Sequence, residues 1–304
     1  MKTENTTDTN QFDVDVLQKE LSLLGTQFFG LGRRTVFLPV VESTNILAIQ
    51  CALKGADEGT VILTDSQTAG KGRLGRRWID VRGKNVLSST IVTPHFPPYL
   101  LIMLASLAVV DAIAECCGLE ASIKWPNDIL IGSRKVAGIL IETSHDLSGR
   151  MVAVMGIGIN VNGRIEHMPL PQHTEGSVRD SEQTPAQAAP QQRATTLETE
   201  CEHPVQREIL LAHLLYHLER VYLALQQEAQ EGVAATNGDT QARQVLNNWR
   251  QRLSTLGRSI KVRQGDTLIE GVAEDVGESG ELILRSSTGK RVIITWGDVG
   301  YPSE

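Results

Sequence analysis

Residues 121–161 read ASIKWPNDILIGSRKVAGILIETSHDLSGRMVAVMGIGINV, and this stretch decides the fold. Its apolar and β-branched runs predict strands over residues 121–125, 128–132, 136–142 and 151–161. In the last of these strands glycine alternates with isoleucine, so one strand face carries no side chains. Glycine inside a strand indicates either close approach of a ligand or tight packing against another backbone, and both interpretations stay open here.

Strands and helices alternate upstream of this stretch. Apolar residues at helical spacing predict an amphipathic helix over residues 14–24. The almost uncharged run 99–117 is too long for a strand and favours a buried helix. A further helix is predicted over residues 45–54, where Ser43 or Thr44 would cap its first turn. Strands are predicted over residues 35–41, 60–66 and 86–93.

The composition changes after residue 162. Residues 163–204 are polar and poor in large apolar residues, which predicts a flexible insert. Two helices are predicted next, over residues 205–228 and 240–254. Short strands separated by glycine turns then predict a small barrel, with strands at residues 259–262, 267–275, 282–286 and 291–296. The predicted units are therefore an N-terminal tail with a short helix (1–34), a central domain (35–254) and a C-terminal barrel (255–304).

The overall composition predicts a cytosolic globular protein. The 304 residues are 41% hydrophobic, enough for a sizeable core, and the net charge of −7 argues against a nucleic-acid binder. No signal peptide is expected, and the apolar run 100–110 is judged too short to span a bilayer. The 34 residues before the first predicted strand leave no room for a winged-helix domain. No zinc or disulfide spacing is found among the four cysteines, Cys51, Cys116, Cys117 and Cys201.

The strongest chemical signal is the basic loop, residues 70–78 (GKGRLGRRW). Its glycines permit close approach to a ligand, and its cations can bind carboxylate and phosphate oxygens: Lys71, Arg73, Arg76 and Arg77. A solvated basic turn is the simpler alternative. The loop also fits GxGxxG, but no helical pattern follows it, so a dinucleotide site is not predicted.

Three further segments add polar groups beside strands. Lys124-Trp125-Pro126-Asn127-Asp128 predicts a turn from which Asp128 could reach a magnesium–phosphate group. Lys135 stands just before a buried strand in which Gly138 leaves one face open. An ordinary turn and a solvated strand-edge lysine are the simpler alternatives for these two segments. The third segment is the glycine-rich run 156–162.

Taken in order, these segments resemble the motifs of the biotin protein ligases. That family carries STN, GRGRxGRxW, KWPND, KxAGIL and GxGIN, and the corresponding segments here are residues 43–45, 70–78, 124–128, 135–140 and 156–160. The resemblance implies an α+β fold: a mixed-sheet catalytic domain, like that of class II synthetases, followed by a small SH3-like barrel. One departure is Lys71, which replaces an arginine of the family motif and keeps the charge but loses the bidentate fork.

The resemblance also implies site roles. The ureido end of biotin would be bound by Ser43, Thr44, Asn45 and Gln67, with Trp78 as an aromatic wall. Lys71, Gly72 and Arg73 would fold over the biotin carboxylate and the α-phosphate. Arg76 would contact phosphates, and Lys135 the reacting carboxylate and phosphate. Asp128 and Asn160 would lie on the nucleotide side. The remaining motif residues assigned to the binding site are Gly70, Lys124, Gly138, Gly156 and Gly158.

The implied reaction joins biotin to ATP as biotinyl-5′-AMP, with Mg²⁺, and then transfers biotin to a lysine of a biotin carboxyl carrier protein. The implied partners are biotin and that carrier, with no DNA and no membrane, and a homodimer is left open. Two alternatives remain at this stage. One is a lipoate or octanoyl protein ligase, and the other is a biotin-responsive transcriptional repressor.

Overall fold

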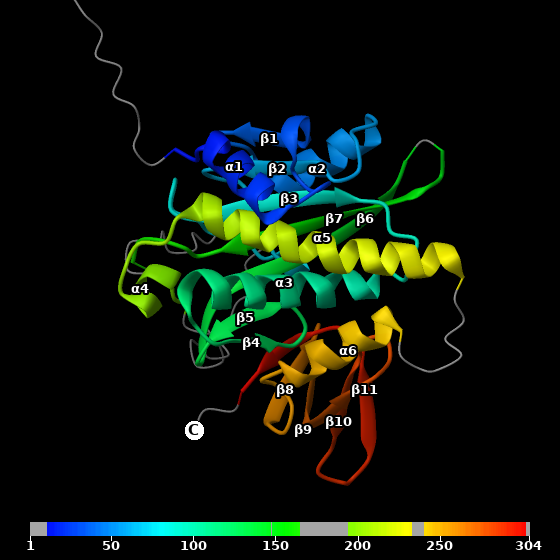
Figure 1. The fold of residues 1–304 in the computed structure, drawn as a ribbon. Helices are drawn as coiled ribbons and strands as arrows, with labels where there is room; N and C mark the ends of the chain where they lie inside the picture. The colour runs from blue at the N-terminus through cyan, green and yellow to red at the C-terminus, as the bar shows by residue number, and fades with distance from the viewer. Residues whose placement is uncertain (1–10, 147, 165–193, 233–239, 302–304) are drawn as a thin grey trace, which may run out of the picture.

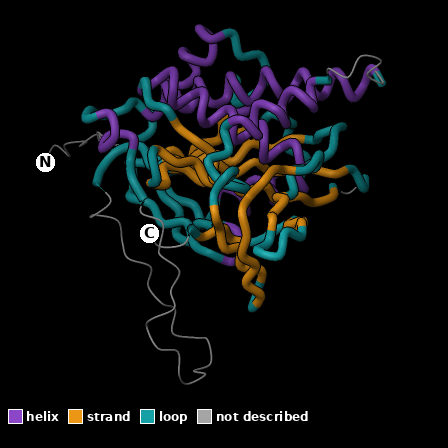
Figure 2. Tube along the Cα trace, turned by 90° about the horizontal axis from the view of Figure 1, so that it is seen from below, coloured by secondary structure: helices purple, strands orange, loops and turns teal. Residues whose placement is uncertain are grey.

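The computed structural model describes residues 11–146, 148–164, 194–232 and 240–301. Figure 1 shows a large sheet covered by long helices, with a smaller sheet below it near the C-terminus, and in Figure 2 the long helices lie along one side of the strands. The expected α+β class, a mixed sheet followed by a small all-β unit, is confirmed.

The large sheet has seven strands in the order β1-β2-β3-β7-β6-β5-β4. The β1–β2 pair is parallel and the other pairs are antiparallel, so the sheet is mixed. Its strands are β1 (Thr35–Leu38), β2 (Val61–Thr64), β3 (Val86–Val92), β4 (Ala121–Lys124), β5 (Asp128–Ile131), β6 (Arg134–His145) and β7 (Met151–Ile159). Each corresponds to a predicted strand, with ends that differ by a few residues.

Residue alternation along these strands gives the sheet two different faces, because successive side chains point to opposite sides. In β7, Ala153, Met155 and Ile157 belong to the main core, while Val152 and Val154 pack in a second, smaller cluster. The main core also contains the long helices α1 (Val14–Leu24), α3 (Tyr99–Cys117) and α5 (Arg207–Glu231), and the second cluster contains α2 (Thr44–Leu53). The two faces are therefore covered by different helices.

Helix α3 is the central core helix of the main layer. It is 19 residues long with a mean hydropathy of 2.2, so by length and composition it passes for a membrane span. The expectation that the longest apolar run is too short to span a bilayer was therefore wrong. That run was taken to end at residue 110, whereas the apolar helix continues to Cys117. Across 18 residues of this helix, 67% are buried inside the protein, where the helix packs against α5 and the sheet. Burial in the core accounts for its hydropathy.

The second sheet is antiparallel, with the order β11-β10-β9-β8-β12. It comprises β8 (Ser259–Gln264), β9 (Thr267–Val276), β10 (Leu282–Arg285), β11 (Arg291–Ile294) and β12 (Asp298–Gly300). The sequence did not predict β12. Helix α6 (Gln241–Gln251) precedes this sheet, and the indole nitrogen of Trp125 donates to the Gly280 carbonyl at 2.9 Å. Trp125, in the large sheet's KWPND turn, thus ties the two sheets together.

Two local expectations need correction. Ser43 occupies the N-cap position of α2, but its side chain makes no capping bond, and the Thr44 amide instead donates to Gln67 Oε1 at 2.8 Å. The predicted flexible insert also ends earlier than expected. Residues 194–204 are packed on the large sheet and contain the short helix α4 (Leu197–Cys201), in which Leu197 is fully buried. Residues 165–193 of that insert lie outside the described residues.

Candidate active site

The site is built on a glycine floor, formed by Gly138, Gly156 and Gly158 on the face of the sheet that also carries α2. Gly138 of β6 lies directly opposite Gly158 of β7, and Gly156 lies opposite Leu140. A methyl group on Gly156 would lie 2.0 Å from Asn45 Oδ1, and one on Gly158 would lie 2.7 Å from the Trp78 ring. The glycines are therefore required for close approach, which was one of the two interpretations left open by the sequence.

A polar cluster of Ser43, Thr44, Asn45, Gln67 and Ser89 lies at one end of this floor. Ser89 on β3 donates to Asn45 Oδ1 at 2.6 Å, and Asn45 Nδ2 donates to Glu142 at 2.8 Å. Gln67 Oε1 accepts from the Thr44 amide. Except for Gln67, these side chains are at most 4% exposed, so a ligand here would meet a preorganised set of donors and acceptors.

The basic loop folds back over the other end of the floor as a small hairpin. The Trp78 amide donates to the Gly70 carbonyl at 2.9 Å, and the Gly72 amide donates to the Arg76 carbonyl at 2.8 Å. Between them, Arg73–Gly75 form a short 3-10 turn (η2) instead of an α-helix, so the GxGxxG match is not a dinucleotide motif here. The hairpin sets the indole of Trp78 against the facing pair Gly138 and Gly158.

Each cation over the floor has a partner. Lys135 Nζ lies 2.6 Å from Asp128 Oδ1 and 5.7 Å from the centre of the Trp78 ring. Within the basic loop, Lys71 Nζ lies 3.5 Å from Glu142. Arg73 donates to Asn127 Oδ1 at 3.0 Å, and Arg76 pairs with Asp298 of β12. The loop is therefore held in place by carboxylate and amide oxygens from three different segments: β6, the turn between β4 and β5, and β12.

Burial affects Arg73 of the loop and the nearby Lys124. It lowers the pKa of Arg73, although the nearby carboxylates of Asp298 and Asp128 oppose the shift. The pKa of Lys124 is lowered in the same way by burial, with Asp128 opposing it. An arginine stays charged even when its pKa falls somewhat, so Arg73 keeps its charge in a partly water-excluded place. Coulombic interactions are stronger there than in bulk water.

The structure brings together all but three of the residues singled out from the sequence. The pocket is lined by Ser43, Thr44, Asn45, Gln67, Lys71, Gly72, Arg73, Arg76, Trp78, Asp128, Lys135, Gly138, Gly156 and Gly158. Gly70, Lys124 and Asn160 do not line it. Gly70 closes the base of the hairpin, and Lys124 lies 5.4 Å from the Tyr301 ring centre. Asn160 Nδ2 donates to the Thr195 carbonyl at 3.1 Å, so it anchors the segment after the insert.

Sequence reasoning missed several residues of the site. Asn127 was considered only as part of a turn, and Arg77, although noted in the loop, was given no role, yet both line the pocket. Glu142 and Ser89 lie inside predicted strands without any local motif. Asp298 comes from the unpredicted strand β12, more than 200 residues after the loop that it contacts. Only strand parity, which puts residues 138, 140 and 142 on one face, would have drawn attention to Glu142.

Comparisons with known proteins agree with this geometry. Residues 37–162 match the biotin/lipoate A/B protein ligase family, and residues 255–299 match the biotin protein ligase C-terminal domain. The biotin–[acetyl-CoA-carboxylase] ligase of Paracoccus denitrificans is 32% identical over 83% of this chain and 94% of its own length. The bifunctional ligase/repressor BirA of Bacillus subtilis is 29% identical over 86% of this chain and 73% of its own length.

A solved structure supports the fold. The biotin protein ligase from Aquifex aeolicus in complex with biotin and ATP superposes with a TM-score of 0.66, at 24% identity, over 88% of this chain and 99% of its own. Fold and matched regions together define the broader class of biotin and lipoate protein ligases. Within that class, the chain belongs to the biotin protein ligase family. The expected biotin ligase activity is thereby favoured over the lipoate ligase and repressor alternatives.

Proposed function

We propose that this pocket condenses biotin with ATP to biotinyl-5′-AMP and then transfers biotin to a lysine of a biotin carboxyl carrier protein. One observation carries the proposal: a buried polar cluster and a set of cations face the same glycine floor from its two ends. Biotin has a neutral ureido head and an anionic tail. The pocket offers hydrogen-bonding groups for the first and positive charge for the second.

The polar cluster suits the head because it holds both donors and acceptors. Asn45 and Ser89 form a fixed pair above Gly156, and any side chain at that glycine would fill the space. Trp78 supplies an apolar wall next to the cluster, and its indole nitrogen is buried without a hydrogen-bond partner among the described residues. The apolar body of biotin would pack on this wall, with its carboxylate directed at the basic loop.

The cations suit the reaction because two anions must meet. A biotin carboxylate attacks the α-phosphorus of ATP, and the bond from that phosphorus to pyrophosphate breaks. Around the pocket the described residues place five cationic side chains against the three carboxylates of Asp128, Glu142 and Asp298. The surplus of positive charge stabilises the transition state through Lys135, Arg73 and Arg76. In the second step a lysine amine of the carrier attacks the carbonyl carbon and AMP leaves.

Asp128 is the residue proposed to hold Mg²⁺ together with the substrate phosphates. A carboxylate combined with phosphate oxygens is the usual ligand set of this ion, and Asp128 lines the pocket beside Lys135. The ion would screen phosphate charge. Asp298, the other lining carboxylate, is paired with Arg76 and keeps that arginine aimed at the pocket. The reaction as a whole is proposed to take place in the cytoplasm.

The proposal is tested by incubating the purified protein with labelled biotin, ATP, MgCl₂ and a biotin carboxyl carrier fragment. We expect label on the carrier, a requirement for ATP, and loss of transfer when EDTA removes Mg²⁺. Lipoate in place of biotin should give no transfer. Absence of biotin transfer, or transfer of lipoate at an equal rate, would contradict the proposed substrate.

We expect Arg73→Gly to release biotinyl-5′-AMP from the closed loop. The side chain of Arg73 donates a hydrogen bond to Asn127 in the KWPND turn, so its removal breaks this contact between the turn and the hairpin. The measurable result is biotin on unrelated proteins added to the reaction, with carrier transfer partly retained. Arg33→Gly is the matched control, because Arg33 is a highly exposed arginine in a surface ion pair with Asp57. If Arg73→Gly labels only the carrier, the loop does not retain the intermediate through this residue.

A further inference from the structure

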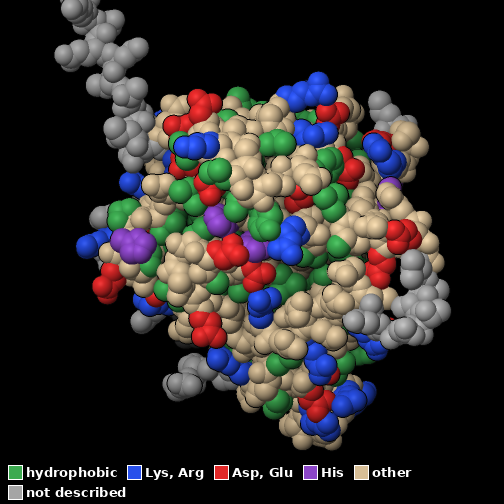
Figure 3. Space-filling view, in the orientation of Figure 1, with side chains coloured by type: hydrophobic (Ala, Val, Ile, Leu, Met, Phe, Trp, Pro, Cys, Tyr) green, Lys and Arg blue, Asp and Glu red, His purple; other side chains and the backbone are tan. Residues whose placement is uncertain are grey.

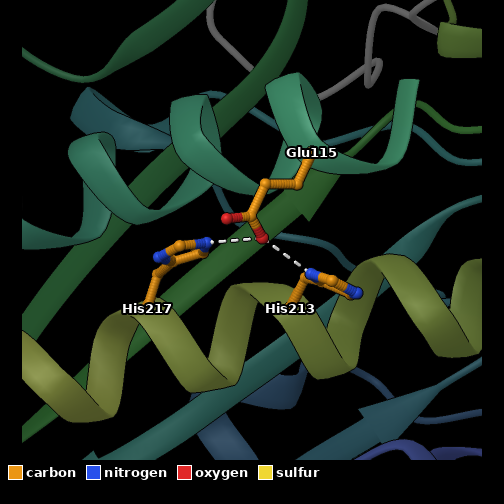
Figure 4. Close-up of side chains that lie close together, drawn as sticks. All are labelled: Glu115, His213 and His217. Carbon is orange, nitrogen blue, oxygen red and sulfur yellow. Dashed lines mark hydrogen bonds and ion pairs between the residues drawn. The ribbon is translucent and has the colours of Figure 1, made fainter. Parts of the chain in front are cut away.

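A second cluster of potentially reactive side chains, Glu115, His213 and His217, lies outside the pocket where α3 and α5 pack together. Glu115 of α3 points at two histidines of α5, His213 and His217 (Figure 4). His213 Nδ1 lies 2.7 Å from Glu115 Oε2, and His217 Nε2 lies 2.9 Å from the same oxygen. These helices cover the face of the sheet opposite the pocket, so the proposed ligase reaction does not use the cluster.

The two histidines are spaced for chelation. They are four residues apart on one helix, so their rings lie one above the other on the same helical face. The same spacing places two metal-binding histidines together in helical zinc sites. One ligand atom from each of the three residues lies within 4.8 Å of the others. Two independent helices thus bring three neutral or anionic donors to one point.

The contacts with Glu115 do not fully satisfy the histidines. His217 Nε2 is buried, and although it is close to the carboxylate it is not aligned for a hydrogen bond. An ion at the common point would supply a partner to this nitrogen.

The surroundings also fit a bound cation. His213 uses Nδ1 toward Glu115, and its other ring nitrogen faces Glu20 of α1 at 3.8 Å. A carboxylate behind a histidine ligand orients the ring in many metal sites. The side chain of Glu115 is 47% exposed, whereas those of His213 and His217 are 20% and 14% exposed. Histidine side chains reach the surface over α3 and α5 in Figure 3, so an ion could enter from solvent.

We propose that Glu115, His213 and His217 form a binding site for one Zn²⁺ ion, with water as the fourth ligand and Glu20 behind His213. Two imidazoles and a carboxylate are a ligand set that zinc accepts in tetrahedral sites with an open position. Zinc–ligand bonds of about 2.0–2.1 Å put neighbouring ligand atoms roughly 3.4 Å apart. The present separations of 2.7 and 2.9 Å would widen slightly, which the half-exposed Glu115 side chain permits. The ion would join α3 to α5.

The test is a zinc titration of the full-length protein after treatment with EDTA and removal of the chelator. We expect the parent to bind one Zn²⁺ equivalent more than Glu115→Gln or His217→Asn. Glu20→Gln should keep the site but bind about tenfold more weakly, as expected for loss of a carboxylate behind a ligand. His145→Asn is the matched control, since His145 is exposed at the end of β6 and should leave binding unchanged. Zinc should raise the melting temperature of the parent and the control but not of the two ligand variants.

Biotin-dependent pyrophosphate exchange provides the check on folding, because the cluster lies on the other side of the sheet from the pocket. Near-parent exchange in both ligand variants, with one zinc equivalent lost, supports the site. A second measurement needs no variant: Co²⁺ bound by the parent should give the visible absorption of a four-coordinate ion. The proposal is overturned if the parent binds no zinc, if both ligand variants bind as the parent does, or if Co²⁺ gives no such absorption.

Discussion

Replacement of Lys135 by alanine is expected to abolish most adenylate formation while the protein stays folded. Among the described residues, Lys135 is the cation that lies beside both an acidic pocket residue, Asp128, and the aromatic wall, Trp78. Removal of one preorganised donor of this kind costs about 3–4 kcal/mol, or roughly 100- to 1000-fold in rate. The measurement is biotin-dependent exchange of labelled pyrophosphate into ATP.

Two further variants test whether the loss of exchange is due to Lys135 itself. Lys261→Ala removes a lysine that is also in an ion pair, with Glu270, but lies in the second sheet, and its exchange rate should equal that of the parent. The double variant Lys135→Ala/Asp128→Asn also removes the Asp128 carboxylate, which the single variant Lys135→Ala leaves without its ion-pair partner. If the double variant regains parent activity, then repulsion by Asp128 explains the loss and the proposed role of Lys135 is wrong.

Substitution of Gly156 by alanine is expected to weaken biotin binding far more than ATP binding. The new methyl group would lie 2.0 Å from Asn45 Oδ1, so the asparagine must leave its place beside Ser89 and Glu142. A buried polar group that loses its partner costs about 1–3 kcal/mol, which corresponds to roughly 5- to 150-fold in affinity. Titration with biotin alone measures this loss directly, and the KM for ATP should change little.

Gly300→Ala provides the matched control. Gly300 also lies in a strand, but a methyl group there would be 3.8 Å from the nearest atom outside its chain neighbours. This variant should bind biotin as the parent does. Unchanged biotin affinity in Gly156→Ala would mean that the Asn45–Ser89 pair is not part of the biotin site.

The elements of the fold were predictable where a local signal existed. Helix α3 was predicted with its exact bounds, since nineteen residues from Tyr99 to Cys117 hold few charges and end at Gly118. Helix α1 likewise follows the spacing of Leu17 and Leu21. The strand β12 carried no such signal, because three residues after a glycine show no alternation. Its position depends on pairing with β8, which is a contact between distant segments.

The candidate site was predictable as a set of residues but not as an arrangement. Glycines and cations stand out in a sequence, so Lys71, Arg73 and Gly158 could be singled out from residue type and spacing. The carboxylates that face them could not. Glu142 and Asp298 are ordinary acidic residues in the sequence, and only the folded chain puts them beside the basic loop. His213 and His217 stand four residues apart but were not singled out from the sequence, and nothing in the sequence connects them with Glu115.

The two faces of β7 carry very different side chains, so the register of this strand with its neighbours cannot shift. Gly156 and Gly158 line the pocket, while the side chains of Met155, Ile157 and Ile159 belong to the core under the helices on the reverse. Since the side-chain repeat of a strand is two residues, a slip of a single position would exchange these sets. Isoleucine side chains would then block the pocket, and glycines would leave cavities in the core. An alternative alignment of this strand would thus be both inactive and unstable, which leaves the chain with one workable pairing at its centre.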